Sequence, residues 1–281
     1  MFRIFVLLLF TYFFFHLHVS GNLSKYINMK YSYLSYSAIW ILAFLTIVQI
    51  ITYFKQPEKE NCHSDCCCDH EHEHESKKPF YKRMIVYIIF FFPLITGFFL
   101  PVATLDSNIV KAKGFSFKAI ESNEQYAQTQ YLKPDTSVYY GKDGYDELMA
   151  EEFKKYSRKN TISLHDEDYL KGMETIYNYP GDFLDKTVEF NGFTYKGDAL
   201  NNKQMFILRF GIIHCVADSG VFGMLVEFPD NMKLKDDEWV HVKGSLSSIY
   251  YQPFKAEIPV LQVKEWSKIE KPDDPYVYRG Y

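Results

Sequence analysis

The sequence predicts a membrane-anchored protein in two parts. We expect a membrane α-helical N-terminal region with three spans, and an extracytoplasmic α+β region that ends in a five-stranded OB-like β-barrel. Apolar and aromatic runs dominate before about Thr104, whereas the later sequence is mixed and charged like a soluble domain. From Lys186 onward, short β-rich runs alternate with turn residues, which is typical of small all-β units. The predicted regions are 1–104, a connector with helices at 105–180, the barrel at 181–270 and a tail at 271–281.

The three predicted spans are residues 2–19, 36–54 and 81–100. Each is close to the roughly 20 apolar residues that cross a bilayer as a helix. A cleaved signal peptide competes with the first span, but His18 would stand at position −3 of a cut after Ser20, which makes a poor cleavage site. A retained helix is therefore favoured. Pro93 and Gly97 are compatible with a kinked third span.

The orientation follows from the distribution of basic residues. The segment between the first two spans has only Lys25 and Lys30, whereas the loop 55–83 is rich in lysine and arginine. The positive-inside rule then predicts a multi-pass protein of the cell membrane with a cytoplasmic N-terminus, a cytoplasmic loop 55–83 and an extracellular C-terminal domain. The basic residues of that loop are Lys55, Lys59, Lys77, Lys78, Lys82 and Arg83.

A short tract at 62–75 holds four of the five cysteines and four of the nine histidines. Thiolate and imidazole are preferred ligands of zinc and other divalent transition metals, so the tract predicts metal binding. Its histidines alternate, and no apolar residues follow to build a small core, which favours a flexible sequestering loop over a folded finger. A solvated acidic linker is the alternative. The candidate ligands are Cys62, His63, Cys66, Cys67, Cys68, His70, His72 and His74.

His16 and His18 lie near the outer end of the first span. Ionisable residues inside spans are candidates for function, whereas imidazoles near the boundary also serve as interfacial anchors. We favour anchoring and keep a membrane ion site as the alternative.

The outer part should begin with an irregular connector and two helices. Residues 143–159 have helical spacing, with acidic residues early and basic residues late. Ser163 is expected to cap a second helix whose apolar face includes Tyr169 and Met173 and which ends at Pro180. Five strands then follow at 187–196, 205–214, 221–228, 239–246 and 258–266. An open sandwich is the alternative to an OB-like barrel.

A second candidate site is formed by His214, Cys215 and Asp218 at the end of the second of these strands. A buried structural cysteine beside a turn-forming aspartate is favoured, because free cysteines are usually inert core residues and neighbours in a strand point to opposite faces. A metal or ligand site and a catalytic thiol are the alternatives. His241 is expected to be a surface residue.

Several functional classes are not expected. A net charge of −4 without a basic aromatic stripe argues against nucleic acid as a partner. No ATP-binding loop or paired-carboxylate hydrolase site is recognisable. We therefore expect no enzymatic activity.

The chain resembles the YcgQ-like family of bacterial membrane proteins along essentially its whole length. The resemblance rests on HLHVSGNLSKYINMKY, the His/Cys loop, ATLDS, RFGIIHCVADSG, DDEWVHVKG and PDDPYVYRG. Members are described as permease subunits, usually encoded beside a larger multi-span permease. Many carry Cys-Cys where this chain has His214-Cys215, a departure that argues against strict dithiol chemistry.

The resemblance implies an accessory subunit of a membrane permease, with a multi-span permease and the lipid bilayer as partners. The His/Cys loop adds the expectation that the subunit handles a divalent transition metal such as zinc. The rival interpretation is a membrane-anchored ligand-binding or thiol-redox module that acts through the outer β domain. Homo-oligomer formation is left open.

Overall fold

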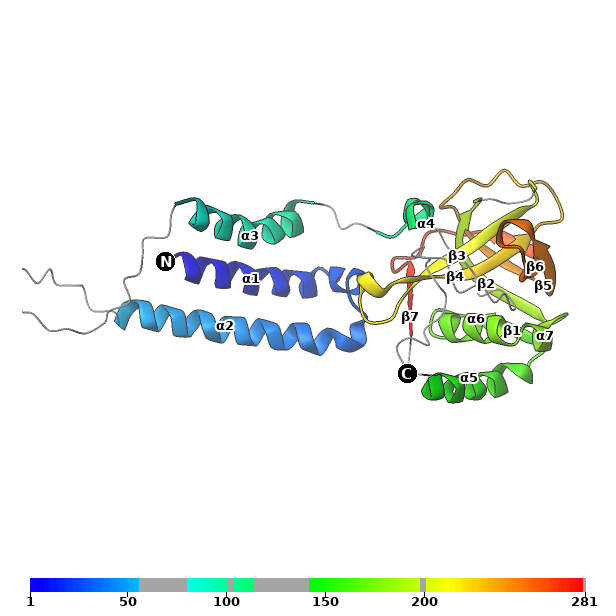
Figure 1. Cartoon of the computed structure of the whole chain (residues 1–281), viewed down its shortest axis with the longest axis horizontal. Coiled ribbons are helices and arrows are strands. Elements are labelled where there is room, and N and C mark those ends of the chain that lie inside the picture. The colour runs from blue at the N-terminus through cyan, green and yellow to red at the C-terminus, as the bar shows by residue number, and fades with distance from the viewer. Residues whose placement is uncertain (56–79, 101–103, 114–141, 198–200, 280–281) are drawn as a thin grey trace, which may run out of the picture. The chain divides into compact units, whose positions relative to one another are not determined.

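The computed structural model describes residues 1–55, 80–100, 104–113, 142–197 and 201–279 (Figure 1). The chain forms two compact units. The helical unit comprises Met1–Ser24 and Met29–Ala103, and the outer unit comprises Lys25–Asn28 and Thr104–Tyr281. The four residues Lys25–Asn28, which stand between the first two helices in sequence, thus belong to the outer unit.

The helical unit contains α1 (Phe2–Val19), α2 (Ser32–Lys55) and α3 (Phe80–Phe99), with short 3-10 turns at Asn22–Lys25 and Met29–Tyr31. Helix α1 packs beside α2 (Figure 1), and its aromatic rings contact those of α3. The ring centroids of Phe13 and Phe98 are 5.3 Å apart. Gly97 allows α1 and α3 to approach closely, because a Cβ at this position would lie 2.5 Å from the ring of Phe13.

Two described helices are long and apolar enough to cross a bilayer, namely Phe2–Val19 and Met29–Lys55. In α3 the described apolar stretch, Met84–Phe99, is shorter, so the third span stays a prediction. Large apolar side chains on these helices are exposed in the isolated chain, including Trp40 at 74% and Phe44 at 64%. Exposure of this kind is typical of helices that face lipid or other helices.

The outer unit is a mixed α+β domain. Its helices are α4 (Ser107–Lys113), α5 (Lys142–Ser157), α6 (Tyr169–Asn178) and α7 (Pro180–Phe183). The strands are β1 (Thr161–Leu164), β2 (Thr187–Tyr195), β3 (Gln204–Ile212), β4 (Gly220–Glu227), β5 (Trp239–Tyr251), β6 (Ala256–Lys268) and β7 (Tyr276–Tyr278). Two 3-10 turns, η4 (Val216–Asp218) and η5 (Gln252–Phe254), lie between β3 and β4 and between β5 and β6.

The seven strands form one mixed sheet in the order β1-β2-β5-β6-β4-β3-β7, and β2 also pairs with β3. Within the set β2 to β6, each strand therefore pairs with two others of the set, in parallel between β4 and β6 and antiparallel elsewhere, while β2 and β3 also pair with β1 and β7. These five strands are the five predicted from sequence. The structure shows a mixed sheet. The OB-like barrel stays a prediction, because it depends on whether the sheet closes.

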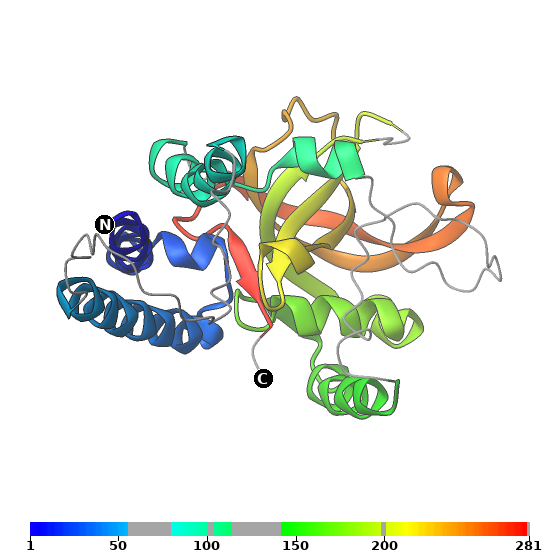
Figure 2. The same ribbon diagram turned by 60° about the vertical axis from the view of Figure 1, so that its left-hand side comes forward.

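The core of the outer unit lies between the strands and α6. Helix α6 covers the sheet, and α5 packs against α6 on the side away from the sheet (Figure 2). Met173 and Ile176 of α6 have no exposed surface and contact a cluster that includes Phe190 and Leu208. The helical spacing of the first pair and the strand positions of the second bring apolar faces together.

The structure differs from the sequence prediction around Ser163 and in short elements that the sequence did not predict. The predicted helix at 143–159 is present as α5, but Ser163 caps no helix. Ser163 lies in β1, where its hydroxyl donates to the carboxylate of Glu189 on β2. The alternation Thr161-Ile162-Ser163-Leu164 follows strand periodicity, and burial of Ile162 and Leu164 decides the conformation. The short parallel strands β1 and β7 were not predicted.

Candidate functional site

His214, Cys215 and Asp218 form a tight turn after β3. The Asp218 carboxylate accepts hydrogen bonds from the backbone N–H groups of His214, at 3.0 Å, and Cys215, at 2.9 Å. The Nδ1 atom of His214 lies 2.8 Å from the same carboxylate. The Cys215 side chain in turn accepts from the backbone N–H of Asp218. The aspartate thus shapes the turn, but Cys215 is half-buried and does not match the buried cysteine of the favoured interpretation.

The turn does not assemble a recognisable metal centre. Within the described ranges, no three or more His, Cys, Asp or Glu side chains gather where they could hold an ion. The carboxylate of Asp218 already accepts three contacts, and a structural zinc site uses four protein ligands. A metal role for this turn stays a prediction that the geometry does not favour.

The turn instead holds the Lys25–Asn28 segment. Ile27 and Cys215 form an antiparallel β-bridge. The backbone N–H of Asn28 donates to the His214 carbonyl at 2.9 Å, and its side-chain amide donates to the Ile213 carbonyl at 3.0 Å. The N–H of Val216 donates to the Tyr26 carbonyl at 2.8 Å. Four successive residues of the turn region thus contact the connection between α1 and α2.

The two membrane histidines lie in different surroundings. The ring of His18 is 3.9 Å from that of Tyr36, and its Nε2 is buried without a hydrogen-bond partner among the described residues. His16 packs against Tyr12 and Phe98. The structure therefore does not bring the two imidazoles together in a shared site. Whether they anchor the helix or serve an ion site stays untested.

The predicted metal ligands of the tract at 62–75 lie outside the described residues. These candidate ligands are Cys62, His63, Cys66, Cys67, Cys68, His70, His72 and His74. Their prediction stands on sequence alone.

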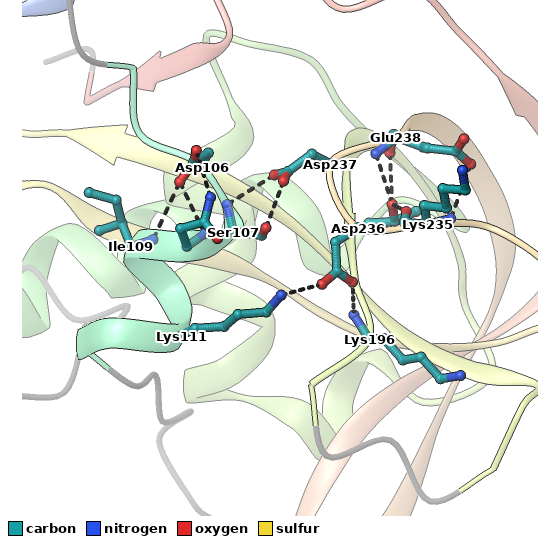
Figure 3. A network of polar contacts seen from close by, with 11 residues as sticks. Asp106, Ser107, Ile109, Lys111, Lys196, Lys235, Asp236, Asp237 and Glu238 are labelled. Atoms are coloured by element: carbon teal, nitrogen blue, oxygen red, sulfur yellow. Dashed lines mark hydrogen bonds and ion pairs between the residues drawn. The ribbon is translucent and has the colours of Figure 1, made fainter.

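A second network joins α4 to the loop before β5 (Figure 3). The Asp237 carboxylate accepts from the Ser107 backbone N–H at 2.9 Å and from the Ser107 hydroxyl at 2.6 Å. Asp106 caps the same first turn, accepting from the N–H of Asn108 at 3.0 Å. Asp237 has a positive φ of 66°, which an aspartate tolerates better than most residues. Both carboxylates thus serve the start of one short helix.

The neighbouring acidic residue holds the far end of α4. Lys111 forms an ion pair with Asp236 at 2.7 Å, and Asp236 also accepts from the backbone N–H of Lys196. The hydrogen bond and charge of Asp236 raise the pKa of Lys111 above its usual value. The ion pair is largely solvated, so most of the anchoring comes from Val110, which is fully buried.

A cavity of about 220 Å³ lies beside this network. Phe193 and Phe210 form one aromatic wall, with ring centroids 5.5 Å apart and planes 14° from parallel, and Trp239 lies next to Phe193. The lining also includes the segment from Thr104 to Asp106, held by a 2.9 Å hydrogen bond from the Leu105 N–H to the Tyr276 hydroxyl. Asp237, Lys271 and Pro275 complete the lining.

Sequence reasoning missed this cavity, although its walls come from stretches that carry the family resemblance. ATLDS contributes Thr104, Leu105 and Asp106, DDEWVHVKG contributes Asp237 and Trp239, and the tail contributes Pro275 and Tyr276. Likewise, the stretch after α1 meets RFGIIHCVADSG at Cys215. The sequence signal that could have found the cavity is that several motifs carrying the family resemblance have no evident local role.

Two family models match the chain, one in each part. Residues 2–116 match the family model described as the DUF1980 N-terminal domain, and residues 139–279 match the DUF1980 C-terminal domain. The chain belongs to the DUF1980 family. Among relatives, the UPF0703 protein YcgQ of Bacillus subtilis (strain 168) is 64% identical over 285 residues and covers 100% of both chains.

A second relative of this DUF1980 chain carries a functional name. It is the "Putative two-component membrane permease complex subunit" of Streptococcus mutans serotype c (strain ATCC 700610 / UA159). The two are 34% identical over 272 residues, which cover 95% of this chain and 94% of the relative. The recognised family is therefore confirmed, and its name together with the apolar helices α1 and α2 supports association with a membrane.

Proposed function

We propose that this DUF1980 protein is a non-enzymatic accessory subunit of a membrane permease. The observation that carries the proposal is the near full-length similarity to a relative named as a subunit of a two-component membrane permease complex. The exposed apolar surfaces of α1, α2 and α3 support it, because a multi-span partner and lipid are the two surroundings that would cover them.

The same proposal places the outer unit on the extracellular side. The bridge between Ile27 and Cys215 supports a shared side for the α1–α2 connection and the outer unit, because both partners belong to that unit. If α1 and α2 both span, loop 55–83 follows α2 on the opposite side of the bilayer. The six basic residues of that loop then favour the cytoplasm.

We further propose that β2 to β6 close into an OB-like barrel. The pairing of β2 with β3 supports closure, since it joins the ends of the run β2-β5-β6-β4-β3. A five-stranded barrel with mostly antiparallel pairing matches the OB architecture. The fold does not by itself identify a ligand.

Purification from native membranes tests the permease assignment. The tagged chain, expressed from its own locus and extracted in mild detergent, should co-purify with a multi-span membrane protein in a fixed ratio. Substitution of exposed apolar residues on α2 by polar ones should reduce recovery of that partner, whereas matched substitutions on the surface of α5 should not. Recovery of the chain alone under these conditions would contradict the assignment.

A second proposed function, metal handling, rests on the tract at 62–75. Four cysteines and four histidines exceed the ligands that one tetrahedral ion needs, so alternative ligand subsets should bind Zn²⁺ reversibly. Zn²⁺ competition with a chelator should show binding by the full chain. This zinc binding should disappear when the four cysteines are replaced by serine and the four histidines by asparagine. Equal zinc retention by both proteins would remove this part of the proposal without touching the permease assignment.

The rival thiol-redox function would depend on Cys215. In the described parts of the chain this cysteine is free, and no second cysteine accompanies it. Its backbone is engaged in the turn and in the bridge to Ile27. These contacts support a structural role for Cys215 over an exchange reaction, which needs an accessible thiolate.

A further inference from the structure

We propose that the aromatic cavity of the outer unit binds a small organic cation, such as a primary amine with an apolar body. The cavity volume of about 220 Å³ falls below the roughly 300–1,000 Å³ typical of sites for drug-sized molecules. It therefore suits a ligand the size of a single amine with one ring or a short chain. This proposal does not depend on the permease assignment.

The sign of the ligand charge follows from the lining. Asp106 and Asp237 accept hydrogen bonds from backbone N–H groups and from neutral side chains. Among the residues that the structure describes, no cationic side chain forms an ion pair with either carboxylate. Lys271 is the lining cation, and it is exposed at the surface. The formal charge of the lining is thus negative by one, and an ammonium group would find two carboxylates with remaining acceptor capacity.

The aromatic wall suits the body of such a ligand. Phe193, Phe210 and Trp239 present ring surface, and ring faces attract cations as well as apolar groups. The guanidinium of Arg209 already occupies a position 5.5 Å from the Trp239 ring, which shows that a cation is tolerated beside this indole. The Tyr276 hydroxyl accepts from the Leu105 N–H, which holds Leu105 in the lining.

Part of the cavity lining follows α3 in the sequence. Thr104, Leu105 and Asp106 form one wall, and in sequence they follow α3, which ends at Phe99. A ligand in the cavity would therefore contact the first described residues of the outer unit after α3.

Matched probes test the charge preference. In a W40F/W266F background of the full chain in detergent, Trp239 is the sole remaining tryptophan, because the sequence contains three. Phenethylammonium, 2-phenylethanol and 3-phenylpropionate share one apolar body and differ in charge. We expect a saturable change in Trp239 emission with the ammonium probe, and binding at least about tenfold weaker for the other two, as expected for loss of a charge-assisted hydrogen bond.

Two variants separate the site from general effects. D237N keeps a carbonyl oxygen for the Ser107 N–H but removes the charge, so it should weaken ammonium binding by about tenfold. E257Q removes an exposed carboxylate near the β5–β6 turn and should bind like the parent. If the tryptophan substitutions prevent folding, calorimetric titration of the otherwise unmodified chain and its D237N and E257Q variants measures the same comparison.

The possible results either support the cation site or contradict it. Charge-selective binding that D237N weakens and E257Q does not would support the site. Equal binding of all three probes, equal affinities of D237N and the parent, or no saturable signal from the ammonium probe up to about 10 mM would overturn it.

Discussion

Two buried arginines show how single residues fix the outer unit. Arg279 in the tail forms an ion pair with Glu174 of α6, and neither side chain has exposed surface. Arg209 of β3 is 1% exposed, pairs with Asp166 and donates to the Tyr276 carbonyl at 3.2 Å. Arg279 therefore ties the tail to α6, and Arg209 ties the loop before α6 and the tail to the sheet. Removing one partner of a buried ion pair strongly destabilises the folded state, because the other charge stays buried.

Replacing Glu174 by glutamine should destabilise the outer unit by about 3–5 kcal/mol, because Arg279 would remain buried without its counter-ion. The double variant E174L/R279M should recover much of the loss, since it removes both charges and keeps apolar volume. Thermal and denaturant unfolding of the detergent-solubilised chain measures both effects. A loss below about 1 kcal/mol for E174Q would be the value of an exposed pair and would contradict the burial.

The Ser163 hydroxyl makes stability depend on pH through Glu189. Its hydrogen bond to Glu189, and the ammonium of Lys243 at 3.5 Å, lower the pKa of that carboxyl. A lowered folded pKa adds stability above the unfolded value of about 4.3, and this stability is lost as pH falls through the folded pKa. S163A should therefore cost about 1 kcal/mol at pH 7 and progressively less below about pH 4.

Unfolding titrations at pH 7 and pH 3 check the Ser163 prediction. S248A is a matched control, because Ser248 is an exposed serine on β5. Its effect should be the same at both pH values. A pH-independent loss in S163A would show that the hydroxyl acts through packing and not through Glu189.

At the scale of elements, a close approach between β3 and β4 requires a glycine. Gly223 has φ +159°, and a Cβ there would lie 2.1 Å from the Ile207 carbonyl oxygen. No rotamer change can relieve a clash with backbone, so the strands would have to separate. The hydroxyl of Tyr177 also donates to the Gly223 carbonyl at 2.9 Å, which links α6 to the same point.

G223A should destabilise the outer unit by at least about 2 kcal/mol or prevent its folding. The control is G144A in α5, where an added Cβ would meet no heavy atom within 4 Å and the change should gain about 0.5–1 kcal/mol. Circular dichroism melts of both variants provide the comparison. Parent-like stability of G223A would mean that β3 and β4 are farther apart than described.

Sequence periodicity predicted elements better than it predicted the contacts between them. The five main strands followed from alternation and turn residues, because these signals are local. Strand β1 has only four residues, and Ser163 also suits a helix N-cap, so the local signal was ambiguous. The contact of Asp237 with Ser107 joins residues 130 positions apart, and no spacing rule encodes such a pair. The His214 turn was interpretable because Asp218 is only four residues away.

At the scale of the whole molecule, the outer unit incorporates chain from two places. Lys25–Asn28 comes from between α1 and α2, and the remainder begins at Thr104. The α1–α2 connection is therefore more than a linker, since it completes the turn after β3.

Replacing Ile27 by cysteine should allow a disulfide with the native Cys215, because directly opposed residues in an antiparallel bridge have Cα atoms about 4.5–5.5 Å apart. Cys62, Cys66, Cys67 and Cys68 should first be changed to serine. Mild oxidation should then give a faster-migrating species on a non-reducing gel. The same protein with C215S should not form it. Absence of the cross-link in the I27C protein would contradict the incorporation of this segment.

The bridge at Ile27 also constrains the order of assembly. The amide of Asn28 bonds to the Ile213 carbonyl 185 residues later in the chain. At synthesis rates of about 5–20 residues per second, the early segment emerges roughly ten to forty seconds before its partner. Helices α1 and α2 can form during this delay, whereas the turn at Cys215 cannot be completed. Biogenesis of the outer unit therefore includes a contact between residues far apart in sequence, and chains truncated before residue 213 lack the partner of this early segment.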